Sequence, residues 1–341
     1  MKKTILLPLL VIAAAILIYL LYPRTYKYET SFYDVFDTYS TLTIYSKSDE
    51  EAQAAMDGVH EELIRLNQLY DIYNSYEGIN NIKTINDNAG VAPVEVDEDV
   101  MELLKFAKEA YYDTDGAVNP MMGAVLSIWH DHRTAALDNP EKASLPNMNE
   151  LKEASEHTDI SLLVLDEENS TAYIADSEAS LDVGAVAKGF AADKAVAVLR
   201  DMGIDSALIN LGGNVCAIGR QNSGKPWNIG VTNPENTAES SAVITAEDIS
   251  VVTSGSYQRY FEVEGKRYNH IIDGDTLMPA ERYASVTVTA ESSAVADMLS
   301  TALFILPEDE GDKLADKYGA GVCRIYDDGT ISADKMFTIR Q

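Results

Sequence analysis

The segment from Leu181 to Phe190 constrains the fold of this chain more than any other stretch. It reads Leu181-Asp182-Val183-Gly184-Ala185-Val186-Ala187-Lys188-Gly189-Phe190. Its two glycines allow a tight turn into a helix and the close approach of a ligand. Asp182 and Lys188 flank the start of that helix, where backbone N–H groups attract anions. The segment predicts a corner for a phosphate and its metal ion; the alternative is a turn that needs glycine for its geometry, with Lys188 solvated.

A second candidate site lies on a helix predicted to begin after Ser292 or Ser293 and to end near Leu306. Asp297 and Thr301 are four residues apart, so their side chains share one face of this helix. Carboxylate and hydroxyl oxygens suit Mg²⁺ or Ca²⁺ rather than zinc, and two such ligands leave room for water, a backbone carbonyl and a ligand phosphate. The alternative is an acid in the first turns of the helix with a packed threonine.

Two histidine-containing segments are further candidates. In a strand, His270 and Ile272 would face one way, and Ile271 and Asp273 the other. His270 would be a general base near neutral pH, or a structural histidine at a strand end. The sequence Trp129-His130-Asp131-His132 is predicted to be a helix end or loop with structural histidines rather than a metal site.

Composition excludes several functions. The chain has 341 residues, a formal net charge of -29 and 46% hydrophobic residues. Such an acidic chain is a poor match for nucleic acid or for a surface held against anionic lipid. Predicted helices and strands mix without the regular alternation of a doubly wound sheet, which favours an α+β fold in a single domain.

The N-terminus is predicted to be separate from the folded body. An apolar run of about 18 residues follows Lys2 and Lys3, long enough to span a bilayer as a helix with the body outside. We expect an anchor at residues 1–23, a tether at 24–31 and the globular domain at 32–341, on the extracytoplasmic face of the cell membrane. A cleaved signal peptide is the alternative. Cys216 and Cys323 are expected to be buried thiols, with a disulfide as the alternative.

Several segments occur in an order that is specific to one family. They are Phe36-Asp37-Thr38, Tyr73-Asn74-Ser75-Tyr76, Asn86 to Gly90, Asp115-Gly116-Ala117-Val118-Asn119-Pro120, Leu181 to Phe190, Asn210-Leu211-Gly212-Gly213-Asn214, Thr253 to Arg259, His270 to Asp273, Ala296-Asp297 and Thr301-Ala302-Leu303. Together they resemble the ApbE family, the FAD:protein FMN transferases, over nearly all of the chain after residue 35.

The resemblance implies an enzyme that cleaves the diphosphate of FAD, attaches FMN to a Thr or Ser hydroxyl of an acceptor flavoprotein and releases AMP. The resemblance also implies acceptors such as membrane redox-complex subunits or extracytoplasmic reductases. The implied FAD contacts are Phe36, Tyr76, Ala117, Val118, Asn119, Asp182, Lys188 and Ile271. The implied Mg²⁺ ligands are the Ala185 carbonyl, Asp297 and Thr301. His270 or Asp273 is the candidate base for the acceptor hydroxyl.

The chain departs from the family pattern at a few positions. Phe36 and Asp37 stand where the family often has Met-Gly, and Asn119 replaces an Asp. Gly274-Asp275-Thr276-Leu277 stands where the family has Pro-Arg-Thr-Gly. Two alternative functions remain at this point: an Mg²⁺-dependent FAD pyrophosphatase, in which water replaces the acceptor hydroxyl, and a flavin-binding surface protein without turnover.

Overall fold

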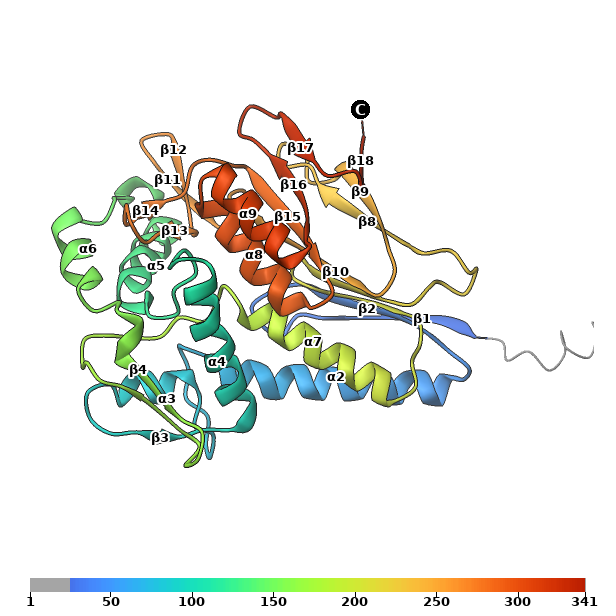
Figure 1. Cartoon of the computed structure of the whole chain (residues 1–341), viewed down its shortest axis with the longest axis horizontal. Coiled ribbons are helices and arrows are strands. Elements are labelled where there is room, and N and C mark those ends of the chain that lie inside the picture. Colours follow the sequence, from blue (N-terminus) through green and yellow to red (C-terminus); the bar gives the residue numbers. More distant parts are fainter. Residues whose placement is uncertain (1–24, 341) are drawn as a thin grey trace, which may run out of the picture.

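An eight-stranded sheet forms the centre of the computed structural model, which describes residues 25–340 (Figure 1). Every neighbouring pair in this sheet runs antiparallel. In spatial order its strands are β1 (Tyr26–Phe32), β2 (Ser40–Ser46), β6 (Ala207–Leu211), β7 (Asn214–Ile218), β10 (Ile249–Gly255), β15 (Ser285–Ala290), β16 (Gly321–Ile325) and β17 (Ile331–Ala333). An antiparallel sheet combined with helices confirms the predicted α+β class.

One face of the large sheet is covered by helices (Figure 1). The helices α2 (Asp49–Tyr70), α7 (Ala187–Asp201) and α8 (Ser293–Ile305) contact its strands, and α9 (Glu308–Tyr318) packs on α8. Helix α8 is apolar around most of its circumference, which is typical of a helix enclosed on all sides. Its N-cap is Ser292, whose hydroxyl accepts from the Val295 N–H. Of the two serines predicted as caps, Ser292 is therefore the one that the structure confirms.

The opposite face of the sheet is covered by a smaller antiparallel sheet of β8 (Trp227–Thr232), β9 (Ser240–Ala246) and β18 (Phe337–Ile339). Successive residues of a strand point to opposite faces. Accordingly, in β16 Cys323 packs with the smaller sheet, whereas its neighbour Val322 packs in the core on the helical side. Both predicted buried thiols are confirmed, since Cys216 and Cys323 are buried and free.

Two further groups of elements extend from the helical side (Figure 1). The first contains α3 (Ile82–Asp87), α4 (Glu98–Asp113), β3 (Val94–Glu95), the 3-10 turn Ile160–Leu162 and the hairpin of β4 (Leu163–Asp166) and β5 (Thr171–Ile174). The second contains α5 (Gly123–Asp138), the 3-10 turn Pro140–Lys142, α6 (Met148–Ser155), β11 (Tyr260–Val263), β12 (Lys266–Asn269), β13 (Ile272–Asp273) and β14 (Met278–Pro279). Within this second group, Trp129 links α5 to the turn between β13 and β14, because its indole N–H donates to the Leu277 carbonyl at 3.0 Å.

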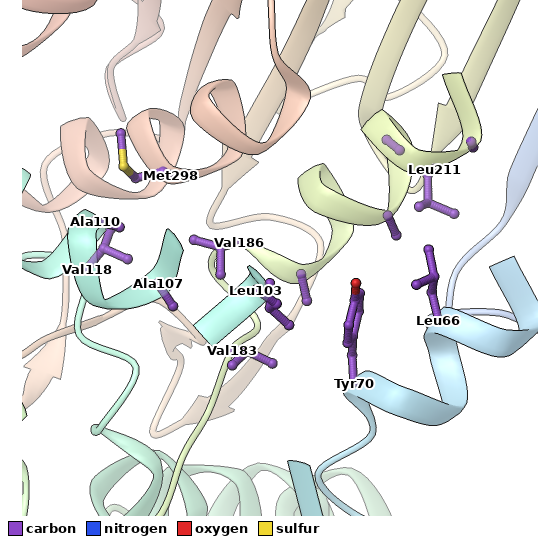
Figure 2. Close-up of a cluster of buried hydrophobic side chains, with 14 of the residues drawn as sticks. Leu66, Tyr70, Leu103, Ala107, Ala110, Val118, Val183, Val186, Leu211 and Met298 are labelled. Carbon is purple, nitrogen blue, oxygen red and sulfur yellow. The ribbon is translucent and has the colours of Figure 1, made fainter. Parts of the chain in front are cut away.

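The main core lies between the helices and the large sheet, and Figure 2 shows part of it. Side chains from α2, α4 and α8 meet the segment that precedes α7. Within that segment, Val183 and Val186 are almost fully buried, at 3% and 1% exposure. Burial of these two valines holds the decapeptide in place, because each contributes roughly 1.5–3 kcal/mol relative to an exposed side chain.

Two predictions concern the N-terminal region. One is wrong, and the other falls on residues that the structure does not describe. The tether predicted at residues 24–31 is wrong for most of its length, because Tyr26–Phe32 forms β1 and pairs along its whole length with β2. Alternation of aromatic or β-branched residues with charged ones suits an edge strand. The predicted anchor at residues 1–23 lies outside the described residues. Between residues 25 and 340, none of the helices combines the length and the apolar character needed to cross a bilayer.

Two internal predictions also change. Residues 74–90 lack helical periodicity, so the sequence predicts a loop there. The structure instead places α3 in this segment, and its first turn carries a capping box between Asn81 and Thr84. The segment Trp129 to His132 lies inside α5 rather than at a helix end or in a loop. Residues two apart on a helix point to different sides. His130 and His132 therefore do not share a face, and His132 instead contacts the Ser144 carbonyl at 2.7 Å.

Candidate active site

The helices α7 and α8 cross in close contact at the site. A Cβ at Gly189 would lie 2.4 Å from the Ser293 carbonyl oxygen and 2.7 Å from the Asp297 Cβ. Only glycine permits this approach, which is the physical reason for the second glycine of the decapeptide. From the other side, the Asp193 carboxylate of α7 accepts hydrogen bonds from Ser292 Oγ, Ser293 N and Ala294 N at 2.6, 2.7 and 3.0 Å. These bonds satisfy the free N–H groups at the start of α8.

Asp297 sits at this crossing with only 3% of its surface exposed. Its Oδ2 accepts from the Gly189 N–H at 2.8 Å, and its Oδ1 lies 3.5 Å from Lys188 Nζ. Burial raises the pKa of the Asp297 carboxyl, while the charge of Lys188 and the Gly189 hydrogen bond oppose that rise. The structure therefore brings together the two residues that the sequence placed more than a hundred positions apart.

The surroundings of Asp297 offer oxygen ligands for a hard cation. Thr301 lies one turn further along α8, and its hydroxyl is 3.4 Å from Ser254 Oγ of β10. In a regular helix the Gly189 N–H would donate to the Ala185 carbonyl. Here it donates to Asp297 instead, which leaves the Ala185 carbonyl without that hydrogen bond. A buried carboxylate, a hydroxyl and a backbone carbonyl match the chemistry that Mg²⁺ prefers. The residues present thus fit the implied ion.

A buried amide lies beside the same carboxylate. Asn214 is 1% exposed, and its Nδ2 has no hydrogen-bond partner in the structure. The Asn214 amide nevertheless faces Asp297 closely enough to oppose the rise in the Asp297 pKa. The Asn214 Nδ2 is a hydrogen-bond donor, so it would pair with Asp297 or with an oxygen of a bound ligand rather than with the cation. Across the described residues, three or more His, Cys, Asp or Glu side chains nowhere gather as a metal cluster, so the site would rely on mixed oxygen donors.

Asp182 lies at the other end of the decapeptide. Its Oδ1 accepts from the Gly184 N–H at 2.8 Å, and its own N–H donates to the Pro120 carbonyl at 2.8 Å. Burial raises the pKa of the Asp182 carboxyl, although the Gly184 hydrogen bond opposes this. Its charge acts on Tyr73 and His130, so it lies near both.

His270 occupies the turn between β12 and β13. Its side chain keeps contact with solvent, and Nδ1 lies 3.2 Å from the Arg259 carbonyl oxygen. Protein atoms crowd around the ring, and this desolvation is the main reason that the pKa of His270 falls to about 4. The positive charges of Arg259, Arg133 and Lys188 act in the same direction. A histidine with this pKa is neutral at pH 7, so it is able to accept a proton.

Asp273 is placed less favourably as a base. Its Oδ1 accepts from the Asp275 N–H at 2.9 Å, and its carbonyl accepts from the Leu277 N–H at 2.8 Å. Asp273 therefore shapes the turn between β13 and β14. Of the two candidate bases, His270 has the better-placed side chain.

The remaining predicted FAD contacts fall into two classes. Phe36, Tyr76, Ala117 and Asn119 keep partial exposure, whereas Val118 and Ile271 are 3% and 7% exposed and pack in the main core. Val118 and Ile271 could therefore meet a ligand mainly through their backbone. Asn119 is already engaged, since its Nδ2 donates to the Thr158 carbonyl at 2.9 Å and its Oδ1 accepts from the Met121 N–H at 2.9 Å.

The loop that carries Phe36 has an unusual backbone. Phe36 and Asp37 both have positive φ, at 54° and 48°, a region that non-glycine residues seldom adopt. Two contacts hold the loop: the Phe36 N–H donates to Asn67 Oδ1 at 2.8 Å, and Thr38 fills the space beside Gly212. Such strain is often found next to a binding site. Tyr76 is fixed separately, by a 2.7 Å hydrogen bond from its hydroxyl to Asp71.

Sequence reasoning missed three side chains that surround the site. Tyr73 and His130 pack with ring centroids 5.1 Å apart, and Arg133 Nη2 lies 3.0 Å from His130 Nδ1. Tyr73 lies in the segment Tyr73-Asn74-Ser75-Tyr76, in which only Tyr76 is a predicted flavin contact. The sequence predicts His130 to be a structural histidine at a helix end or in a loop, whereas it lies inside α5. Helical spacing of His130 and Arg133 on α5 was the signal that could have found them.

Comparison with known proteins assigns the chain to one family. The ApbE family model matches residues 36–324. The chain belongs to the ApbE family. Relatives include the FAD:protein FMN transferase of Treponema pallidum (strain Nichols), which is 34% identical over 316 residues and covers 88% of this chain and 84% of its own length. The enzyme of that name from Haemophilus influenzae is 31% identical over 283 residues, with 80% of each chain covered.

Solved structures of ApbE proteins share the fold. The ApbE protein of Thermotoga maritima superposes with a TM-score of 0.80 at 29% identity, covering 91% of this chain and 97% of its own. A mutant of the flavin transferase ApbE from Vibrio cholerae gives a TM-score of 0.76 at 26% identity, covering 91% and 98%. The predicted ApbE membership and the mixed fold are therefore confirmed.

Proposed function

We propose that this protein is an FAD:protein FMN transferase that moves FMN from FAD to a Thr or Ser hydroxyl of an acceptor flavoprotein and releases AMP. The observation that carries the proposal is the buried Asp297 beside Lys188 at the crossing of α7 and α8. A desolvated carboxylate paired with a single cation is costly unless it serves a ligand. The names of the relatives supply the reaction.

The chemistry requires one proton acceptor and one leaving group. The acceptor hydroxyl oxygen would form a bond to the phosphorus of the FMN half, and the bond from that phosphorus to the bridging oxygen would break. AMP would leave with the bridging oxygen and its electron pair. His270 would take the hydroxyl proton, since a neutral imidazole is available at pH 7.

Residues at the helix crossing would manage the negative charge of the diphosphate. Asp297, Thr301 and the Ala185 carbonyl would hold Mg²⁺. When bound, Mg²⁺ would neutralise diphosphate oxygens and make AMP a better leaving group. Lys188 would turn from Asp297 to a phosphate oxygen, for which a flexible ammonium is suited.

The flavin would lie on the partly exposed side of the decapeptide. Asp182, with its raised pKa, can exchange hydrogen bonds with a heterocycle edge. Phe36 and Tyr76 would offer aromatic surfaces to the flavin, and Ala117 to Asn119 with Ile271 would line its edge, mainly through backbone groups. With an N-terminal anchor, the enzyme would act outside the membrane on redox proteins of that compartment.

The test is transfer to a peptide. Incubating the protein with FAD, Mg²⁺ and acceptor peptides that contain one Thr should add the mass of FMN, less water, to the peptide and release an equal amount of AMP. A peptide with Val in place of that Thr is the control. FMN formed without any acceptor would favour the pyrophosphatase instead, and bound FAD that stays intact with Mg²⁺ would favour a flavin-binding protein without turnover.

A further inference from the structure

Two arginines near His270 differ from most others in the protein. With a net charge of -29, acids are abundant, and Arg65, Arg200, Arg220, Arg267 and Arg324 each have a carboxylate within salt-bridge distance. Among the described residues, no carboxylate lies that close to Arg133 or Arg259. An acidic protein that leaves two neighbouring guanidiniums unpaired keeps positive charge at one place.

Each of these guanidiniums is oriented by a neutral acceptor. Arg133 Nη2 lies 3.0 Å from His130 Nδ1 and, having no acceptor of its own, must be the donor. Arg259 Nη2 donates to the Asp37 carbonyl at 3.3 Å. A carboxylate in either place would cancel the charge that it oriented. An imidazole and a backbone carbonyl fix the guanidinium but leave its charge for a ligand.

The two charges converge on one location from different elements. Arg133 comes from α5, and Arg259 precedes β11, yet both act on the pKa of Tyr73 and of His270. Burial and the charge of Arg259 lower the pKa of Arg133 itself. A half-buried cation next to a like charge is unfavourable in the free protein. An anion bound between the two guanidiniums would remove that penalty.

We propose that Arg133 and Arg259 form a two-part anion site that binds the diphosphate of the dinucleotide on the His270 side, and that His130 is a positioning residue for Arg133. This inference rests on the proposed function. Guanidiniums match phosphate oxygens with paired N–H donors, which complements the single ammonium of Lys188 at the helix crossing. The diphosphate would then lie between Lys188 and the arginine pair, with the reacting phosphorus next to His270.

Inorganic pyrophosphate is the probe, titrated calorimetrically into the full-length protein in metal-free buffer. We expect Arg133→Gln and Arg259→Gln each to weaken its binding about tenfold or more, as the loss of a charge-assisted hydrogen bond predicts. Arg267→Gln is the matched control. It removes one charge from the same β11–β12 hairpin, but Arg267 is already paired with Glu262 at 3.0 Å and should leave binding unchanged.

His130 separates a positioning role from a merely structural one. His130→Gln retains a neutral acceptor and should keep binding near the level of the unmodified protein. His130→Asp supplies a carboxylate, which should weaken pyrophosphate binding as much as Arg133→Gln does. Equal binding by His130→Gln and His130→Asp would contradict the positioning role.

Two outcomes overturn the anion site: unmodified protein that does not bind pyrophosphate, or arginine variants that bind it as tightly as Arg267→Gln does. Arg259 is exposed, so Arg259→Gln should fold even if Arg133→Gln does not. Riboflavin, which lacks phosphate, should bind all variants equally. Failure of FMN transfer with the arginine effects intact would contradict only the proposed function, whereas transfer with no arginine effect would contradict only the anion site.

Discussion

The two halves of the site are built in different ways. The inner half, Asp297 with Lys188 and Gly189, is positioned by the packing of α7 against α8. The outer half, Arg133, Arg259 and His270, consists of partly or fully exposed side chains held by single hydrogen bonds to neutral acceptors. Changes to the inner half should therefore affect both stability and chemistry, whereas changes to the outer half should affect ligand binding and chemistry alone.

The largest expected effect is on catalysis. Asp297→Ala should lower Mg²⁺-dependent FMN transfer about a thousandfold or more, because metal stabilisation of the diphosphate is worth several kcal/mol. Circular dichroism should still show a folded protein. Asp309→Ala removes an exposed acid that only meets Lys313 at 3.6 Å and should leave turnover unchanged. Turnover that survives Asp297→Ala would remove the metal assignment.

Gly189→Ala should be the most destabilising of these changes. Its Cβ would meet backbone and Cβ atoms at 2.4–2.8 Å, none of which can move independently of α8. We expect a loss of about 3 kcal/mol in the free energy of unfolding, typical of severe overpacking, measured by urea titration. Gly58→Ala in α2 is the control: its Cβ would meet chiefly the flexible Met202 side chain at 3.3 Å. That variant should be neutral or gain up to about 1 kcal/mol.

His270→Gln should reduce transfer about a hundredfold while leaving stability nearly unchanged, as the removal of a general base predicts. The pKa of about 4 means that the neutral base forms as pH rises through that value. The acid limb of kcat/KM should accordingly lie near pH 4 and disappear in His270→Gln. Removing the cation of Arg133 or Arg259 should move this limb to higher pH. A limb that stays in place in His270→Gln would assign the base elsewhere.

Asp193→Ala tests the support of the inner half without touching the proposed ligands. It removes the acceptor for three hydrogen bonds at the start of α8 and should cost about 1–2 kcal/mol in thermal or urea unfolding. Asp201→Ala is the control. Asp201 is exposed and ends α7, the helix that also carries Asp193, so its loss should have little effect. A free energy of unfolding equal in the two variants would show that Asp193 does not fix the crossing.

The smallest expected effect has the opposite sign. The pKa of Asp297 is raised in the folded state, so its contribution to stability is present below the unfolded-state pKa and is lost as pH rises through the folded-state pKa. Asp297→Asn should therefore stabilise the metal-free protein slightly at pH 7, with the difference vanishing in acid. Equal stability of the two proteins at pH 7 would mean that Lys188 fully offsets the burial.

Local patterns predicted much of the framework. Apolar residues at helical spacing predict helices at about 50–73 and 97–112, where the structure has α2 and α4, and the serine before an apolar run predicts the start of α8. The strand at Tyr26–Phe32 was missed because an edge strand buries few side chains and its alternation was masked by mixed charge. Helix α3 was missed because a helix of six residues carries little periodicity.

By itself, the sequence determined the family, the α+β class and the identity of the groups at the helix crossing, because glycines, an acid and a hydroxyl at set spacings act through short-range geometry. Only the tertiary structure decided that Asp297 accepts from Gly189 N–H next to Lys188, and that the charges of Arg133 and Arg259 both act on His270. These pairs come from distant segments, and their burial, pKa shifts and unpaired charge depend on how whole helices and hairpins pack.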